Sequence, residues 1–210
     1  MTQQMAVTAR RAKTRARLLD AARAVIAERG AGGATVEAVS ERAGFTRGAF
    51  YSNYASMADL VSDLVQEVGA GRLAAMQEAA ARVRGLGADD FAGVATAALE
   101  VFVGLQPHDV DDTLLLAELE LFAIRTPEVR ATYTAVTEQT LSTAMDIIET
   151  VLEPMGRRLC TSRRFTAEMI AGYFDHVLRL GHASGQPAGP ERLASGLVDL
   201  LTVITEPKES

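Results

Sequence analysis

Apolar residues recur along most of the chain at the spacing that places them on one face of a helix, and the alternation typical of a half-buried strand is missing. No internal repeat or low-complexity tract interrupts this pattern. Residues 206–210 are predicted to be loose. The sequence therefore predicts an all-α protein, with helices over residues 17–30, 36–43, 47–54, 56–84, 89–106, 113–125, 127–154, 163–183 and 190–204.

Two of these predicted helices are short and lie next to each other in the sequence. Thr35 is a suitable N-cap for the first, because its hydroxyl can accept a hydrogen bond from a free backbone N–H. Gly44 stands where that helix must stop in the left-handed conformation, and Thr46 can cap the second helix. Two helices joined by a tight turn with a glycine form the layout of a DNA-binding helix-turn-helix.

The second short helix has two different faces. Phe50 and Tyr54 are four residues apart, so they share one side and can pack inward. Arginine pairs with guanine edges, asparagine with adenine edges, and hydroxyl groups with phosphate oxygens. The candidates for contacts with DNA are Thr35, Thr46, Arg47, Gly48, Tyr51 and Asn53. Residues of these types also suit a helix surface that only faces solvent.

Residues 15–64 resemble the N-terminal domain of the TetR/AcrR family of bacterial transcriptional repressors. The resemblance rests on several pieces of sequence taken together. They are the helix of residues 17–30, Thr-Val-Glu-Ala-Val at 35–39, Ala-Gly-Phe-Thr-Arg-Gly-Ala-Phe-Tyr at 43–51, and Tyr-Ala-Ser-Met-Ala-Asp-Leu at 54–60. Two positions depart from the family pattern. Met57 replaces a lysine expected to contact phosphate, and Phe45 replaces a smaller aliphatic residue, which we interpret as a packing variant.

The charge of the chain is distributed unevenly. The 210 residues carry a net charge of −6, which argues against a general affinity for nucleic acid. Residues 1–54, however, contain nine lysines and arginines against four acids, a net charge of +5, which leaves −11 for the remainder. We therefore predict a DNA-binding domain with a basic N-terminal arm over residues 1–55, followed by an acidic domain over residues 56–210.

The resemblance implies that residues 56–210 form a helical domain that binds a small-molecule effector and forms a homodimer. The last two predicted helices would supply the dimer contact, as an intersubunit four-helix bundle. Their small and apolar residues could instead only fill the core of the monomer. Glu118 lies within an apolar run, where a carboxylate is costly unless it is paired. The candidates for the effector site are Phe102, Leu115, Glu118, Leu119, Phe122, Tyr133, Met145, Phe174 and His176, although such residues more often simply fill a core.

Other kinds of chemistry find little support in the sequence. We find no nucleophile with its base, no zinc-protease motif, no phosphate loop and no dinucleotide fingerprint, so we predict no catalytic residue, no metal site and no cofactor. The acids near His108 suit a helix N-terminus better than a cation site. Cys160, the one cysteine, is interpreted as an ordinary thiol. The lack of a signal peptide and of a membrane-spanning segment leads us to expect a cytoplasmic protein with no membrane partner.

The sequence thus favours a homodimeric repressor that binds a palindromic, double-stranded DNA operator until a small molecule releases it. Two alternatives remain. The chain could be an activator, or a repressor that needs a corepressor. It could also be an enzyme or carrier that uses the helical domain and keeps a vestigial DNA-binding domain.

Overall fold

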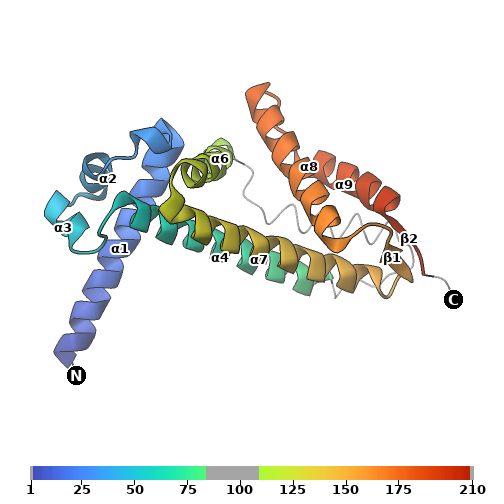
Figure 1. Cartoon of the computed structure of the whole chain (residues 1–210), viewed down its shortest axis with the longest axis horizontal. Helices are drawn as coiled ribbons and strands as arrows, with labels where there is room; N and C mark the ends of the chain where they lie inside the picture. Colours follow the sequence, from blue (N-terminus) through green and yellow to red (C-terminus); the bar gives the residue numbers. More distant parts are fainter. Residues whose placement is uncertain (1, 84–108, 209–210) are drawn as a thin grey trace. The chain divides into compact units, whose positions relative to one another are not determined.

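The computed structural model of the chain describes residues 2–83 and 109–208 (Figure 1). The predicted helix over residues 89–106 lies outside these residues. The described elements are α1 (Thr2–Arg29), the 3-10 helix η1 (Ala31–Gly33), α2 (Val36–Ala43), α3 (Arg47–Tyr51), α4 (Met57–Val83), α6 (Val110–Arg125), α7 (Pro127–Leu152), β1 (Arg157–Leu159), α8 (Arg163–Ala183), α9 (Pro190–Ile204) and β2 (Thr205–Pro207). The all-α fold class is confirmed. Within the described part of the chain, no helix combines the length and hydropathy needed to cross a bilayer.

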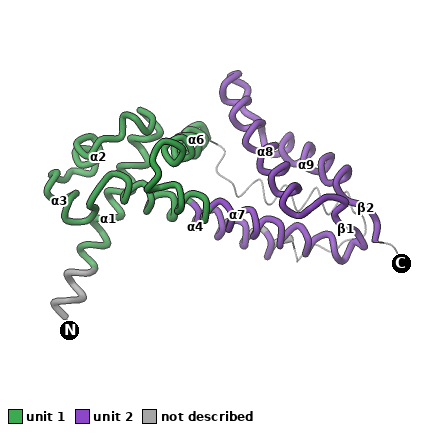
Figure 2. The backbone as a smooth tube through the Cα atoms, in the orientation of Figure 1, with its two compact units in different colours: residues 1–68, 109–136 green, residues 69–108, 137–210 purple. Residues whose placement is uncertain are grey.

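The chain divides into two compact units, drawn in green and purple in Figure 2. Unit 1 contains residues 1–68 and 109–136, and unit 2 contains residues 69–108 and 137–210. The first turns of α4 and α7 and the whole of α6 therefore belong to the same unit as α1, α2 and α3. The sequence analysis divides the chain by function, into a DNA-binding domain over residues 1–55 and a second domain over residues 56–210. This division stays a prediction.

The core of unit 1 is built on one face of α1. Leu18, Ala22, Val25 and Ile26 have the spacing of that face and are all buried. They pack in one cluster with the buried faces of α2, α4 and α6 and with the aromatic ring of Phe50. The inward positions predicted for the second short helix are confirmed, since Phe50 and Tyr54 are both buried.

The predicted start and end of α2 are also confirmed. The Thr35 hydroxyl accepts a hydrogen bond from the Ala38 N–H at 3.1 Å, and α2 ends at Gly44, whose φ of +68° is left-handed. Ser56 caps α4 together with Asp59. Its hydroxyl accepts from the Asp59 N–H at 3.1 Å and donates to the Asp59 carboxylate at 3.0 Å. These local contacts fix where each helix begins.

Four boundaries differ from the prediction by more than one residue. Helix α1 begins at Thr2 and not at residue 17, so the predicted N-terminal arm is helical. Helix α3 ends at Tyr51, and the chain continues in tight turns to Tyr54, whose N–H donates to the Phe50 carbonyl at 3.0 Å. Helix α6 begins at Val110, three residues early, because the Asp109 carboxylate caps it by accepting from the Asp112 N–H at 2.8 Å. Helix α7 ends at Leu152.

Unit 2 contains a short sheet that the sequence pattern did not predict. Strands β1 and β2 pair antiparallel, with Arg158 opposite Glu206. Three residues are too few to show an alternating pattern, so the strands escaped a search for alternation. The expectation of a loose end from Glu206 onward is therefore wrong for Glu206 and Pro207.

Helices α8 and α9, whose predicted bounds are confirmed, pack against each other in unit 2. Their contact depends on Gly196, because a Cβ at this position would lie 2.0 Å from the Tyr173 hydroxyl oxygen. The Tyr173 hydroxyl donates to the Arg192 carbonyl at 3.1 Å. A glycine on one helix thus makes room for a tyrosine that lies across it from the other.

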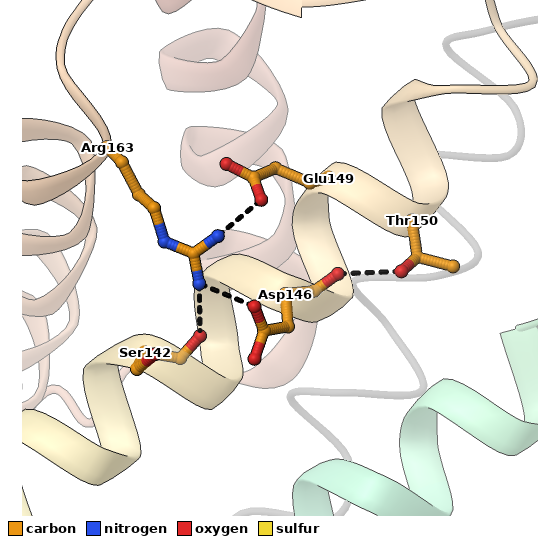
Figure 3. A network of polar contacts seen from close by, with 5 residues as sticks. All are labelled: Ser142, Asp146, Glu149, Thr150 and Arg163. Atoms are coloured by element: carbon orange, nitrogen blue, oxygen red, sulfur yellow. Dashed lines mark hydrogen bonds and ion pairs between the residues drawn. The ribbon is translucent and has the colours of Figure 1, made fainter.

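The start of α8 is tied to α7 by a group of polar contacts (Figure 3). The Arg163 guanidinium donates to the Asp146 carboxylate at 2.6 Å, to the Ser142 carbonyl at 2.9 Å, and to the Glu149 carboxylate. The hydrogen bond with Asp146 is the main reason that the pKa of Arg163 is raised. One guanidinium therefore satisfies acceptors on two successive turns of α7.

Candidate nucleic-acid interface

The N-terminal turns of α2 and α3 carry most of the candidate DNA contacts. Thr46 caps α3, its hydroxyl accepting from the Ala49 N–H at 3.2 Å, as Thr35 caps α2. Both threonines are exposed. Each hydroxyl keeps its own hydrogen available as a donor, so a cap can still donate to a phosphate oxygen.

Arg47 and Glu37 connect these two turns. The Arg47 guanidinium lies 2.8 Å from the Glu37 carboxylate, and the two side chains are 61% and 57% exposed. A hydrogen bond with the Tyr51 hydroxyl, together with the charge of Glu37, raises the pKa of Arg47. The sequence analysis did not single out Glu37. Glu37 could have been found from its position. It lies in the first turn of the first short helix, as Arg47 lies in the first turn of the second.

Tyr51 is held by the core although its side chain reaches solvent. It is 50% exposed, and its ring meets the buried Phe50 ring edge-on, with 5.4 Å between the ring centres. Gly48, one turn earlier, is also exposed. Arg47, Gly48 and Tyr51 thus share an exposed surface on a helix that Phe50 anchors from the other side.

Asn53 is placed differently from the other candidates. Its amide nitrogen donates to the Ala49 carbonyl at 2.8 Å and to the Ser52 hydroxyl at 3.2 Å. The amide therefore closes the C-terminal turn after α3. Its predicted role in reading bases stays a prediction, and it would require the side chain to leave these partners.

A partly buried polar cluster holds α1 against α4. The Arg15 guanidinium pairs with the Asp63 carboxylate and lies 4.6 Å from the centre of the Tyr54 ring. The Tyr54 hydroxyl donates to the same carboxylate at 2.7 Å. Burial, followed by this hydrogen bond and the charge of Asp63, raises the pKa of Tyr54. Arg15 and Tyr54 therefore connect the end of the helix-turn-helix to α1 and α4.

Two other arginines of residues 1–55 also have partners within the protein. Arg17 donates to the Ala43 carbonyl at 2.6 Å and stacks over the Phe45 ring, 4.6 Å from its centre. The large residue at position 45 thus has a packing role, as predicted. Arg42 pairs with Glu28 at 2.7 Å. In contrast, Arg10, Arg11 and Lys13 are exposed on the part of α1 that precedes the core.

The structure distributes the candidate effector residues over both units. Leu115, Leu119, Phe122 and Tyr133 pack in the core of unit 1, with the first two fully buried. Met145, Phe174 and His176 belong to unit 2, where Met145 is buried and His176 is exposed. Phe102 lies outside the described residues. Which of these residues contact an effector stays a prediction.

Glu118 has a partner within its own unit. Its carboxylate accepts a hydrogen bond from the backbone N–H of Ala31, at 2.7 Å. Ala31 begins η1 immediately after α1, and it is buried. The carboxylate in the apolar run thus satisfies a buried donor and connects α6 to the end of α1. The predicted place of Glu118 in an effector site stays a prediction.

Comparison with known proteins identifies this arrangement. The profile of the family described as bacterial regulatory proteins, tetR family, matches residues 18–64.

Residues 18–64 match the N-terminal domain of this family.

The matched segment begins at the first buried residue of α1 and ends within α4, so it includes both short helices.

Solved TetR-family and related structures share the fold over nearly the whole chain. A Mesorhizobium loti protein classed as a TetR-family transcriptional regulator superposes with a TM-score of 0.72 at 16% identity, over 92% of this chain and 98% of its own. The fatty acid degradation regulator FadR from Bacillus halodurans gives a TM-score of 0.71 at 20% identity, over 90% and 94%. FadR from Bacillus subtilis, in complex with stearoyl-CoA, gives 0.69 at 18%, over 88% and 96%. No curated protein matches the chain at the sequence level.

The family match and the helix-turn-helix geometry together support a coarse conclusion. The chain has the fold of TetR-family transcriptional regulators, and the match of residues 18–64 supports a DNA-binding regulator. At identities of 16–20%, the solved structures establish the fold and nothing of the effector or the operator.

Proposed function

We propose that this protein is a homodimeric repressor of the TetR family that binds a palindromic operator and leaves it when a small molecule binds. The observation that carries the proposal is the exposed surface of Arg47, Gly48 and Tyr51 on a helix fixed from behind by the buried Phe50. A rigid helix that presents a cation, an open backbone position and a phenol suits the major groove and its flanking phosphates. Residues 1–55 would contact DNA, and the remaining residues would sense the effector and form the dimer.

The proposed dimer contact uses α8 and α9. Three large apolar side chains on these helices are exposed, Phe165 at 52%, Leu180 at 51% and Val203 at 76%. Burying such residues against the same helices of a second copy would remove apolar surface from water. A two-fold dimer presents two reading helices, and its operator would therefore have two related half-sites.

The proposed effector is a small molecule bound among the helices beyond the DNA-binding domain. The Bacillus subtilis relative was solved with stearoyl-CoA, which supports the idea that this fold accepts small molecules without naming the effector of this chain. The effector must bind more tightly to the form that cannot bind DNA. A hundredfold loss of operator affinity requires a coupling free energy of about 2.7 kcal/mol, and operator DNA must then weaken effector binding by the same factor.

The proposal is tested by selecting sequences from a random double-stranded DNA library with the purified full-length protein. We expect enrichment of a palindrome with half-sites about one helical turn apart, and a mass in solution twice that of the 22.4 kDa chain. Enrichment of no sequence would refute specific DNA binding. A 22.4 kDa particle would refute the dimer.

Release is tested separately once the operator is known. Calorimetry with a small molecule that co-purifies with the protein, with and without operator DNA, measures the coupling directly. Phe174→Ala, in unit 2, should change this response and leave the affinity of the effector-free protein for DNA nearly intact. Equal affinity for the small molecule in both titrations would show that it does not control DNA binding.

A further inference from the structure

The proposed DNA-contacting surface contains an acid. Glu37 lies in the first turn of α2, and its carboxylate is 2.8 Å from the guanidinium of Arg47 in the first turn of α3. More than half of each side chain is exposed to solvent. The pair therefore lies at the surface, on the two helix ends that also carry the caps Thr35 and Thr46.

Stability gives little reason for this pair. Ion pairs between solvent-exposed side chains contribute little to folding, because water screens them and holding two long side chains costs entropy. Other acids of unit 1 have structural partners, such as Asp63, which binds both Arg15 and the buried Tyr54. Glu37 is instead paired with the residue that we expect to read DNA.

A carboxylate on this surface also has a cost for DNA binding. It repels phosphate oxygens and it reduces the charge that Arg47 offers to them, so it weakens binding to DNA of any sequence. The carboxylate can offset this cost only where DNA presents hydrogen-bond donors. In the major groove these donors are the amino groups of cytosine and adenine, and acids commonly accept from the cytosine N4 amino group.

We propose that Glu37 and Arg47 act as one unit that recognises a G·C base pair, with Glu37 as the residue that sets specificity. An ionised carboxylate has about four acceptor positions on its two oxygens. Glu37 can therefore hold one N–H group of Arg47 and accept from cytosine N4 at the same time. The remaining N–H groups of Arg47 are then aimed at guanine O6 and N7, the acceptors beside that amino group.

This inference rests on the proposed function, because it assumes that Arg47 enters the major groove. It adds a residue that the sequence analysis did not place in the site. It also assigns a base pair to be recognised. At sequences without the G·C pair, Arg47 loses the two guanine acceptors O6 and N7, and Glu37 loses the cytosine amino group, so the complex is weakened.

The test compares wild-type protein with Glu37→Gln and with Glu41→Gln as a matched control. Glutamine has nearly the same shape as glutamate, and it removes the charge. Glu41 is an exposed acid on the same helix, and its removal changes the net charge equally without touching the Arg47 pair. A sequence selected by wild-type protein from a random duplex library serves as the specific probe, and random-sequence duplex of equal length serves as the non-specific probe, at one salt concentration.

We expect Glu37→Gln to bind random duplex more tightly than wild type does and to lose discrimination. The ratio of specific to non-specific affinity should fall by about tenfold or more. A second selection with Glu37→Gln should show a relaxed preference at one G·C position in each half-site. Glu41→Gln should keep the wild-type ratio within about twofold.

Two outcomes would overturn the inference. An unchanged ratio in Glu37→Gln, or an equal fall in Glu41→Gln, would show that Glu37 has no particular role, while leaving the proposed function intact. If wild-type protein selects no sequence at all, the proposed function fails, and this inference fails with it. Because both substitutions are at exposed positions, thermal melting should show all three proteins equally folded.

Discussion

Replacing Glu118 by alanine tests how α6 is connected to the DNA-binding domain. The Glu118 carboxylate accepts the Ala31 N–H at 2.7 Å, and Ala31 is only 6% exposed. Alanine removes the acceptor and leaves a buried backbone donor without its partner. Glutamine keeps an acceptor oxygen at nearly the same place and removes only the charge.

The size of the effect follows from this contact. Hydrogen bonds to charged groups contribute about 1.5–3 kcal/mol, and losing one side of a buried bond has a cost of the same order. We therefore expect Glu118→Ala to lower the free energy of unfolding by about 1.5–3 kcal/mol. For a chain of this size that lowers Tm by roughly 3–12 °C. Glu118→Gln should show less than half of this loss.

The measurement is thermal melting followed by circular dichroism, with urea unfolding as a second measure of stability. Glu41→Ala is the control, because it also removes one carboxylate, and an exposed position should change stability by no more than about 0.5 kcal/mol. Equal melting of Glu118→Ala and wild type would mean that the hydrogen bond contributes nothing. Equal losses in Glu118→Ala and Glu41→Ala would point to net charge as the cause.

Three further outcomes are expected. A dimer that makes about 6–10 phosphate contacts should lose about 10³-fold or more in DNA affinity between about 50 and 200 mM salt, and a flat titration would contradict DNA binding through the basic domain. Arg47→Ala should weaken operator binding roughly tenfold or more per half-site, whereas Tyr51→Phe should weaken it less and keep the sequence preference; wild-type affinity in Arg47→Ala would show that we assigned the wrong face. Burial, followed by the charge of Asp109, raises the pKa of Asp112, so the folded protein holds this proton more tightly than the unfolded chain does, and stability is lost as pH rises through the raised pKa. Asp112→Asn should therefore melt at a higher temperature than wild type at pH 7, and this gap should shrink as pH falls toward about 4; a gap that does not change with pH would contradict the argument.

Helix boundaries were predictable where a local signal fixes them. Helices α2, α8 and α9 were predicted with the observed bounds, since Thr35, Gly44 and Pro190 mark their ends within one turn of sequence. The start of α6 was predicted three residues late. Residues 107–112 were interpreted as a break whose acids suit a helix N-terminus, but Asp109 was not identified as the N-cap itself.

Contacts between residues far apart in the chain could not be predicted from the pattern of apolar and polar positions. The exposed positions of Arg47 and Tyr51 followed from the helical period. The pairing of Arg15 with Asp63, 48 residues away, did not, because it depends on how α1 and α4 pack. The Glu37–Arg47 pair joins two helices whose N-terminal ends were predicted and whose mutual placement was not.

The close fit between Gly196 and Tyr173 has a consequence for how relatives of this chain diverge. A methyl group at position 196 would lie 2.0 Å from the tyrosine oxygen and 2.6 Å from the nearest ring carbon, so any side chain there displaces the aromatic group. We expect the two positions to covary. Descendants that gain alanine or serine at 196 should carry a smaller residue at 173, and those that keep the tyrosine should keep the glycine. An aligned set of close relatives would therefore record this contact as a correlated pair of columns.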